Sequence, residues 1–237
     1  VGPGGLGSVM ALIDLHTHTT ASDGTLTPKE LVARAAQKGL VAVAITDHDS
    51  LAGLPEARLA GAEHGVDVVT GVELSVADGP SSIHLVGLFL PETPGPLAEQ
   101  LDWLRQRRHD RNHRILEKLK SLGVSLDYDA VTVLAQGVVG RPHIAQALLA
   151  QGVVSSFKEA FTRFLGVYGK AYVPKDKLPL ETAIALLHAE GALAVLAHPY
   201  ILGQSGPVLA ETVTRYRDAG LDAIEAFYTE HSQYQTL

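Results

Sequence analysis

Two histidines one residue apart, His16 and His18 in "IDLHTHTTASDG" (13–24), are the first residues of the chain that could do chemistry. They follow a short apolar run, and a threonine-rich turn then leads to Asp23 and Gly24. Side chains alternate along an extended segment, so this spacing places both imidazoles on one side. A single histidine in a loop is more often solvated than a metal ligand. The pair therefore becomes a candidate metal site only if further ligands lie near it.

Carboxylates and imidazoles recur after the other β-branched runs of the sequence. They are Asp47, His48 and Asp49 after 41–46, Glu73 in 67–74, His198 after 192–197 and Glu225 in 221–227. In barrel-like α/β folds the loops at the carboxyl ends of the strands build the site. His84 is an exception, because it lies at the start of the run 83–90. The joint placement favours one metal cluster over scattered solvated residues.

The elements that would position these residues alternate between strand and helix. The expected strands are 11–14, 41–46, 67–74, 83–90, 192–197 and 221–227. A helix between the first two strands is marked by Thr27 as N-cap, Pro28 in the first turn, Glu30 in a capping box and Gly39 at its end. This alternation predicts βα units and a largely parallel sheet. Residues 97–175 break the pattern and predict an insertion of two or three helices.

Composition sets limits on the class of protein. A chain of 237 residues allows one large α/β domain that carries an insertion. No apolar run approaches the roughly 18–20 residues of a membrane span, so we expect no membrane association and a cytoplasmic protein. The absence of cysteine excludes disulfides and thiolate chemistry. The Gly-rich residues 1–9 are expected to form a flexible leader before Met10.

The charge and the donor types narrow the chemistry further. A net charge of −7 argues against a general nucleic-acid coat but allows a small pocket for one phosphorylated end. Imidazole and carboxylate together suit zinc, manganese or iron. Without thiolates the site is not expected to be purely structural. Glu73 could bridge two ions through its two oxygens.

Several motifs together resemble a known family. The segments "DLHTHTTASDGTLTPKELVARAAQKGLVAVAITDHDS", "GVELS", "IHLVGLF" and "LAHPY" are similar, in order and spacing, to the motifs of the PHP (polymerase and histidinol phosphatase) metallophosphoesterases. "RNHRILEKLKSLG" and "GRPHIAQALL" resemble the branch that dephosphorylates nucleoside 3′,5′-bisphosphates and trims RNA from the 5′ end. The resemblance implies an α/β fold: a distorted (β/α)7 barrel formed by 10–96 and 176–237, with a helical insertion, or cap, at 97–175.

The resemblance also implies a centre of two to three divalent ions, either Mn, Zn or Fe. Carried over by position, the first ion would be held by His16, His18 and Glu73. The second would be held by Glu73, His84 and His198, and the third by Asp23 and His48. Family members end with a D-x-H motif that completes the first and third sites. The given sequence stops at "EHSQYQTL" before such a motif, so we expect the C-terminal part of the barrel to be missing from it.

Basic residues in the expected insertion suggest a phosphate site. Residues 101–123 predict a helix whose apolar stripe runs from Leu101 to Leu122 and includes Arg108, with Arg111 on its flank. A buried basic side chain is costly unless it meets an anion or a carboxylate. Either Arg108 or Arg111 contacts a substrate phosphate, or the two form structural ion pairs with the barrel. The sequence leaves both options open.

Arg141 and His143 flank Pro142 just before another predicted helix. An arginine and an imidazole beside a helix N-terminus form a good phosphate receptor. By resemblance, we expect both residues to bind the phosphate and to take part in catalysis. The alternative is an N-capping turn with a surface arginine. The sequence does not decide whether His143 protonates the leaving group.

These observations predict metal-dependent hydrolysis of a phosphomonoester on a nucleotide, with trimming of short RNA as a related activity. The partner would be a phosphorylated small molecule or a short oligonucleotide. One alternative is a histidinol-phosphate phosphatase, and another is an amidohydrolase-type enzyme, although no expected strand ends in the bridging lysine such enzymes carry. A third is a non-catalytic domain that binds metal or nucleotide. The oligomeric state cannot be read from the sequence.

Overall fold

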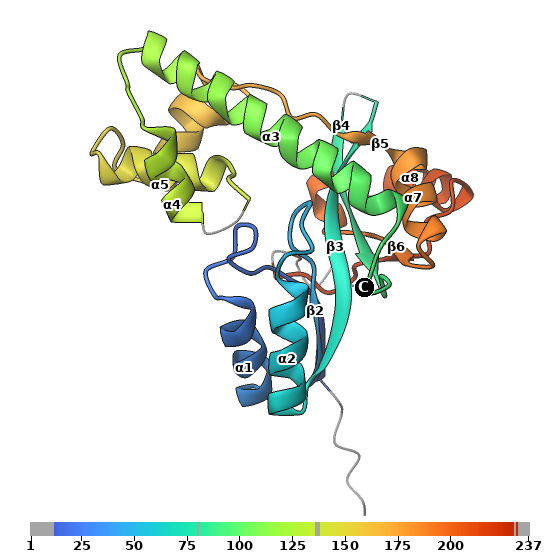
Figure 1. Cartoon of the computed structure of the whole chain (residues 1–237). Coiled ribbons are helices and arrows are strands. Elements are labelled where there is room, and N and C mark those ends of the chain that lie inside the picture. The colour runs from blue at the N-terminus through green and yellow to red at the C-terminus, as the bar shows by residue number, and fades with distance from the viewer. Residues whose placement is uncertain (1–11, 80, 136–137, 230, 232–237) are drawn as a thin grey trace, which may run out of the picture.

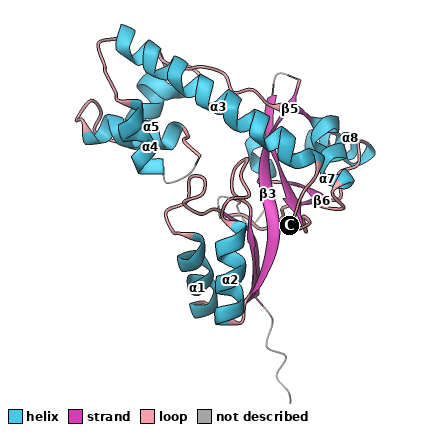
Figure 2. Cartoon of the chain, viewed as in Figure 1, coloured by secondary structure: helices cyan, strands magenta, loops and turns pink. Residues whose placement is uncertain are grey.

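A curled sheet with helices on its outside forms the centre of the molecule (Figure 1, Figure 2). The computed structural model describes residues 12–79, 81–135, 138–229 and 231. The expected leader 1–9 and Met10 lie outside the described residues. Within them the fold is mixed α/β, and the sheet has seven strands in the order β1-β2-β3-β4-β6-β7, with β5 paired to β3.

The first three strands follow the predicted parallel arrangement. They are β1 (Leu12–Thr17), β2 (Leu40–Ile45) and β3 (Asp67–Asp78), each parallel to its neighbour. Beyond them come β4 (Ser81–Leu88), the short β5 (Leu178–Pro179), β6 (Leu193–Leu196) and β7 (Ala223–Ile224). All six expected strands are present in some form, although β7 is much shorter than the expected 221–227. β5 was not expected.

The sheet is less parallel than predicted, because β4 runs antiparallel to both β3 and β6. Asp78 pairs with Ser81, so only two residues connect β3 to β4. A connection this short can join only antiparallel strands. Gly79 has a φ of 55°, as hairpin turns require. The Asp-Gly pair at 78–79 was the sequence signal for this hairpin.

Two helices cover β1 to β3 on one side. They are α1 (Pro28–Gln37) and α2 (Leu54–His64), and their apolar residues share a core with β2. The Thr27 side chain accepts a hydrogen bond from the backbone N–H of Glu30, and the Glu30 carboxylate accepts one from Thr27. The predicted capping box is therefore confirmed. α1 enters directly from the turn that carries His18 and Asp23.

The segment 97–175 is helical, as predicted. It contains α3 (Pro96–Ser121), α4 (Tyr128–Ala135), α5 (Arg141–Ala150), the short α6 (Phe157–Ala160) and a π-helical turn η1 (Phe161–Leu165). These are more elements than the two or three helices expected. No strand occurs among the residues of this segment that the structure describes. Its division from the rest as an inserted domain stays a prediction.

The long helix α3 belongs to two hydrophobic cores. Its first half contributes Leu97, Leu101 and Leu104 to a core with β3, β4 and helix α7 (Leu180–Ala189). Its second half contributes Ile115 and Leu119 to a core with α4, α5 and η1. Leu122, expected at the end of the apolar stripe, is instead 43% exposed because the helix ends at Ser121. The helix crosses above the sheet from one core to the other (Figure 1).

The chain then returns through α7 and β6 to the short 3-10 helix η2 (Pro199–Leu202), helix α8 (Gly206–Asp218) and β7. Over the described part of the chain, every helix is too short or too polar to cross a membrane.

Candidate metal centre and phosphate pocket

Five imidazoles surround the carboxylate of Glu73, which lies on β3 and is 1% exposed. The shortest nitrogen–oxygen distances to it are 3.4 Å for His16, 3.1 Å for His18, 3.0 Å for His48, 2.8 Å for His84 and 2.9 Å for His198. These five histidines come from four separate segments of the sequence, because His16 and His18 lie in the same one. The structure therefore brings all the histidines predicted as ligands to one carboxylate.

Asp23 extends the cluster on one side. Its carboxylate lies 3.6 Å from Nδ1 of His18 and 3.7 Å from Nε2 of His48. The potential ligand atoms form three overlapping groups: His16, His18 and Glu73; His18, Asp23 and His48; and His48, Glu73 and His84. His198 joins the last group through Nε2, which lies 3.3 Å from Nδ1 of His84. All seven predicted metal ligands are thus neighbours.

The turn that carries His18 and Asp23 is held by a buried carboxylate. Asp47 accepts hydrogen bonds from the backbone N–H of Thr19 at 2.7 Å, from its hydroxyl at 2.7 Å and from the hydroxyl of Ser22 at 2.6 Å. A Cβ on Gly24 would lie 2.3 Å from the carbonyl oxygen of His18, so only glycine fits there. Asp47 thus shapes the turn and does not join the metal cluster, contrary to its expected place among metal-capable residues.

The antiparallel β4 explains why His84 lies at the start of its strand. His84 pairs with Ser75, which is two residues beyond Glu73 on β3. The beginning of an antiparallel strand lies at the same edge of the sheet as the end of its neighbour. His84 therefore reaches the same edge as the residues that follow parallel strands. The antiparallel direction of β4 thus explains why His84 joins the cluster although it lies near the start of its strand.

Glu225 contacts the imidazole of His16 and the backbone of His198. Its Oε1 lies 3.2 Å from Nδ1 of His16, which turns Nε2 of that ring toward Glu73. Its Oε2 accepts a hydrogen bond from the backbone N–H of His198 at 2.5 Å. His198 has a φ of 28°, a strained conformation that this hydrogen bond helps to hold. The sequence placed Glu225 at the correct edge but gave it no role.

Burial and charge oppose each other in this cluster. Burial disfavours a proton on His16, but its hydrogen bonds to the carboxylates of Glu225 and Glu73 raise its pKa to about 10. Burial lowers the pKa of His48 to about 4. Burial would raise the pKa of Glu73, but the surrounding imidazoles hold it well below its usual range. The centre is therefore a buried carboxylate that is ionised and needs positive charge beside it.

The donor set fits divalent metal ions. Nδ1 of His48 lies 3.0 Å from Glu73 without the geometry of a hydrogen bond, and Nδ1 of His198 is also buried without a partner among the described residues. Buried nitrogens without partners are rare and call for a ligand. Imidazole and carboxylate without thiolate are ligands suited to zinc, manganese and iron.

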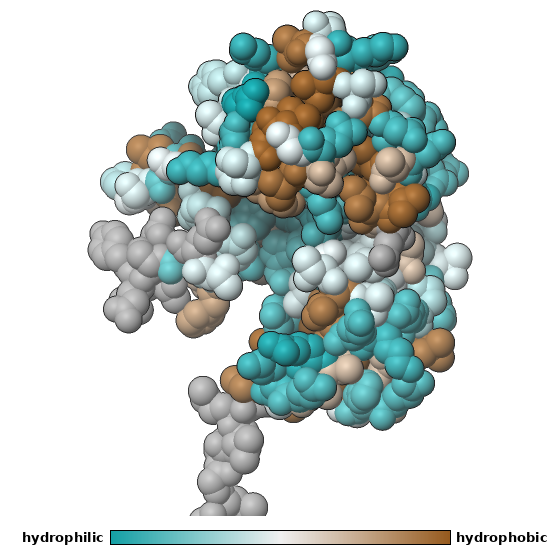
Figure 3. All heavy atoms as spheres, turned by 90° about the vertical axis from the view of Figure 1, so that its left-hand side faces the viewer, coloured by the Kyte–Doolittle hydropathy of each residue, from teal (hydrophilic) through white to brown (hydrophobic). Residues whose placement is uncertain are grey.

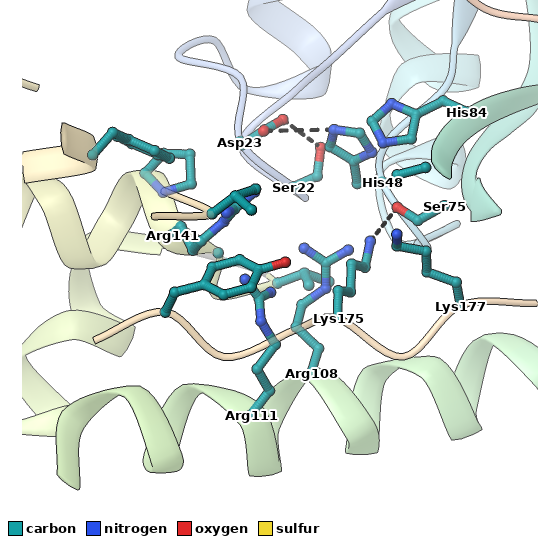
Figure 4. A pocket seen from close by; sticks show the side chains of 17 residues that line it. Ser22, Asp23, His48, Ser75, His84, Arg108, Arg111, Arg141, Lys175 and Lys177 are labelled. Carbon is teal, nitrogen blue, oxygen red and sulfur yellow. Dashed lines mark hydrogen bonds and ion pairs between the residues drawn. The ribbon is translucent and has the colours of Figure 1, made fainter. Parts of the chain in front are cut away.

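A pocket of about 260 Å³ opens beside the cluster (Figure 4). One wall carries Ser22, Asp23, His48, Ser75 and His84. The opposite wall carries five cationic side chains: Arg108, Arg111, Arg141, Lys175 and Lys177. Arg108 and Arg111 extend from the same helix, and Lys175 and Lys177 from the segment above it (Figure 4). We call these two sides the metal wall and the cationic wall.

Two cations of this wall bind a carboxylate that was expected near the metals. Asp49 is fully buried and accepts hydrogen bonds from Arg108 and from Nζ of Lys175, the latter at 2.9 Å. Lys175 also donates to the hydroxyl of Ser75. Asp49 has a φ of 50°, which is uncommon for a residue other than glycine. Asp49 therefore links the two walls. The sequence counted it among the residues that could bind metal, but in the structure it pairs with cations instead.

Two more cations of this wall, Arg111 and Arg141, are anchored through backbone carbonyls. Nε of Arg111 donates to Val173 O at 3.0 Å, and Nη1 of Arg141 donates to Leu165 O at 3.0 Å. Burial and nearby arginines lower the pKa of Arg111 to about 10, and burial lowers that of Lys175 to about 8. Cations that have lost water in this way gain from an anionic ligand. Arg108 forms the structural ion pair that was one predicted option, with Asp49, and it also lines the pocket. Its contact with a substrate phosphate stays a prediction.

His143 lies apart from the pocket lining. Its Nδ1 accepts a hydrogen bond from the backbone N–H of Gly140 at 3.0 Å, which caps the start of α5. Burial lowers its pKa, so the ring is neutral near pH 7. This is the capping turn that the sequence offered as the alternative. A catalytic or phosphate-binding role for His143 stays a prediction.

Sequence reasoning missed Lys175 and Lys177. They lie in "YVPKDK" (172–177), between the helical segment and β5. Their spacing of two residues puts both side chains on one side of an extended segment. That spacing was the available signal, although the sequence does not say which surface the segment crosses. Ser22 and Ser75 were missed as well.

Comparisons with known proteins agree with this geometry. The PHP domain matches residues 14–174. A "5'-3' exoribonuclease" of Haemophilus influenzae is 38% identical over 212 residues, which cover 90% of this chain and 77% of that protein. A "3',5'-nucleoside bisphosphate phosphatase" of Chromobacterium violaceum is 32% identical, with coverage of 94% and 79%. The crystal structure of a protein from Bifidobacterium adolescentis, described as a metal-dependent phosphoesterase, has a TM-score of 0.86 and 30% identity and covers 96% of this chain and 81% of its own.

Proposed function

The chain belongs to the PHP domain family, and we propose that it is a metal-dependent phosphoesterase that hydrolyses phosphomonoesters of nucleotides, nucleoside 3′,5′-bisphosphates in particular. The observation that carries this proposal is the pocket between the two walls. Imidazoles and carboxylates converge on one side, and five cations face them from the other. This arrangement suits a substrate with more than one phosphate group.

We propose three metal positions within the cluster. The first uses His16, His18 and Glu73, the second Glu73, His84 and His198, and the third Asp23 and His48. The three overlapping groups of ligand atoms support this assignment. The same donors suit Mn, Zn or Fe. Divalent ions held there would activate a water molecule for attack on phosphorus and neutralise phosphate oxygens.

The side chains of the protein orient the substrate and hold it. Arg108, Arg111 and Arg141 offer planar guanidinium groups that bind phosphate oxygens in pairs. Lys175 adds a charge that is already held by Asp49 and Ser75. Glu225 fixes the ring of His16, so that Nε2 faces the reaction site. The ring of His143, neutral near pH 7 and apart from the pocket lining, would have to gain a proton before it could protonate the leaving oxygen.

We also propose the finer architecture that the sequence suggested. Residues 10–96 and 176–237 would form a distorted (β/α)7 barrel, and 97–175 would form a helical insertion that covers its open edge. The separate core of Ile115, Leu119 and their neighbours supports a distinct insertion. A cytoplasmic location remains part of the prediction.

Phosphate release from adenosine 3′,5′-bisphosphate in the presence of Mn²⁺ tests the proposal. We expect release by the wild-type protein and none by a variant with His16→Ala and His18→Ala. His64→Ala is the matched control, because this histidine is exposed at the end of α2. A folded wild-type protein loaded with metal that releases no phosphate would refute the bisphosphate proposal.

Trimming of short RNA is a second candidate function. The similarity to the exoribonuclease of Haemophilus influenzae favours it, and the cationic wall would accept a terminal 5′ phosphate. Shortening of a 5′-phosphorylated oligoribonucleotide, followed on a denaturing gel, tests this activity. Histidinol phosphate, which carries one phosphate, serves as the comparison substrate. Preference for it would favour the histidinol-phosphate alternative, and tight binding of the bisphosphate without turnover would favour a binding domain.

A further inference from the structure

A second cavity lies directly beside the phosphate pocket and shares Arg108 and Val138 with it. Its volume is about 480 Å³, within the range of roughly 300–1,000 Å³ typical of small-molecule sites. Residues from both parts of the molecule line it, with Ala21 and Ala52 on one side and Asn112 and Tyr128 on the other. The rest of a ligand whose phosphate contacts Arg108 could therefore bind in this second cavity.

Aromatic rings form one side of this cavity. Tyr128, at the start of α4, is half-buried, and the rings of His109 and His113 on α3 lie against it, with centroids 5.3 Å and 4.2 Å away. The two imidazoles also contact each other through Nε2 atoms 3.1 Å apart. The Tyr128 ring is thus held in place before any ligand arrives. A planar heterocycle gains by stacking on such a ring.

Asn112, which also lines this cavity, has a buried polar atom without a partner among the described residues. Asn112 is 0% exposed, and its Nδ2 donates to Val139 O at 2.9 Å, which fixes the orientation of the amide. Its Oδ1 has no hydrogen-bond partner among the described residues. A buried acceptor left unpaired is costly, so such atoms are rare unless a ligand satisfies them. An amine on the edge of a heterocycle would supply the missing donor.

Arg108 joins the two cavities. Its guanidinium lines both, and it is fixed by the hydrogen bond to Asp49. A phosphate bound on one side of it and a flat ring bound on the other would belong to one nucleotide. We propose that the second cavity, lined by Tyr128, Asn112 and His109, binds the nucleobase of the substrate, preferably a base with an exocyclic amine. This inference rests on the proposed function and adds the recognition of the base.

The test compares two substrates that differ only in the base. They are adenosine 3′,5′-bisphosphate and 1-deoxyribose 3,5-bisphosphate, which has no base. We expect the KM of the wild-type protein to be about tenfold lower for the nucleotide, the gain expected from one stacked base. Tyr128→Ala should raise the KM for the nucleotide to that of the base-free compound and leave the KM for the latter unchanged. Tyr128→Phe should retain the preference.

Trp103→Ala is the matched control, since this aromatic residue is exposed on α3 and lines neither cavity. It should change neither KM. Purine riboside 3′,5′-bisphosphate, which lacks the amine of adenine, should bind several-fold more weakly than the adenosine compound because Asn112 Oδ1 stays unpaired. Equal KM values for the nucleotide and the base-free compound would overturn the inference. So would an equal loss for both in Tyr128→Ala with a native circular dichroism spectrum.

A binding measurement distinguishes failure of the proposed phosphatase activity from failure of the proposed base site. If the wild-type protein releases phosphate from neither compound, calorimetric titration of both into the same protein still measures the contribution of the base. A tenfold tighter Kd for the nucleotide, lost in Tyr128→Ala, would support a base site in a protein with another activity. Equal Kd values would reject the base site.

Discussion

The metal wall of the pocket is built from strand ends, and the cationic wall is built from helix faces and one extended segment. On the metal wall, backbone pairing across β1, β2 and β3 fixes where each ligand emerges. On the cationic wall, long side chains reach the pocket from α3, α5 and residues 175–177. Arg111 and Arg141 are anchored to backbone carbonyls, and Arg108 and Lys175 are both anchored to Asp49. Figure 3 faces this side of the molecule and shows a hydrophilic hollow between the upper helical part and the lower part that includes α1.

This difference in construction implies a difference in the effect of substitutions. The five histidines of the metal cluster share the carboxylate of Glu73, so we expect the loss of this carboxylate to weaken every metal position that it would join. On the cationic wall, Arg111 and Arg141 have separate anchors, so we expect each of them to contribute its own share of substrate binding. We therefore expect damage to the metal wall to appear in kcat and damage to the cationic wall to appear in KM.

Glu73→Gln should have the largest effect. The amide keeps the shape of the side chain but loses the charge that five imidazoles surround. We expect the rate of phosphate release to fall by roughly three orders of magnitude or more, together with most of the bound metal. Release assays and elemental analysis of the dialysed protein measure both quantities. Glu63→Gln, an exposed residue of α2, is the control. Full activity in Glu73→Gln would contradict the shared-carboxylate design.

Arg141→Met should rank second. The variant keeps an apolar stem but loses a guanidinium that lines the pocket. A charge-assisted hydrogen bond is worth about 1.5–3 kcal/mol, so we expect KM for the bisphosphate to rise roughly tenfold to a hundredfold with a smaller change in kcat. The same variant should differ little from wild type on a substrate with one phosphate, such as p-nitrophenyl phosphate. A drop confined to kcat would break the distinction between the walls.

The third prediction concerns pH and Lys175. Burial lowers the pKa of its ammonium group to about 8, although Asp49 opposes this. The charged form binds phosphate, so KM should be lowest below pH 8 and rise several-fold as pH increases through about 8. Lys175→Arg keeps its charge throughout this range and should give a flat profile. Parallel profiles for the two proteins would show that another group controls binding.

The smallest effect should come from Thr27→Ala, on neither wall. It removes the hydrogen bond from Glu30 N–H to the Thr27 hydroxyl at the start of α1. We expect the free energy of unfolding to fall by about 1 kcal/mol, with kcat and KM unchanged. Chemical denaturation and standard kinetics measure these values. A marked kinetic change would mean that the entry into α1 controls the turn of His18 and Asp23.

The metal wall could be predicted because its ligands follow strands that the sequence marks clearly. Apolar β-branched runs end at or just before His16, His48 and His198. Backbone pairing of neighbouring strands brings these ends together and does not depend on the other side chains of the strands. His84 fitted the pattern only after the two-residue connection showed that β4 is antiparallel. The local signal for this hairpin was present in Asp78 and Gly79.

The cationic wall could be predicted only in part, because it depends on how distant segments pack. The helical pattern placed Arg108 and Arg111 near the buried face of α3, which is where they lie. It could not show that Asp49 pairs with Arg108 and Lys175, since these residues are far apart in the sequence. Nor could it show that the segment with Lys175 crosses above the pocket. Long charged side chains carry no periodic pattern that reveals their partners.

The participation of α3 in two cores has a consequence for motion. The helix has 26 residues and is therefore about 39 Å long, with Leu101 fixed in one core and Ile115 in the other. If loops alone connected the segment 97–175 to the rest of the molecule, it could rotate about them as hinges. One of its connections, however, is the continuous helix α3, whose two halves are buried in different cores. Widening the pocket requires α3 to bend or the 171–177 segment to shift beside it. The long helix α3 therefore holds the distance between the metal wall and the cationic wall nearly constant. Substrates are then selected by whether they fit this fixed width.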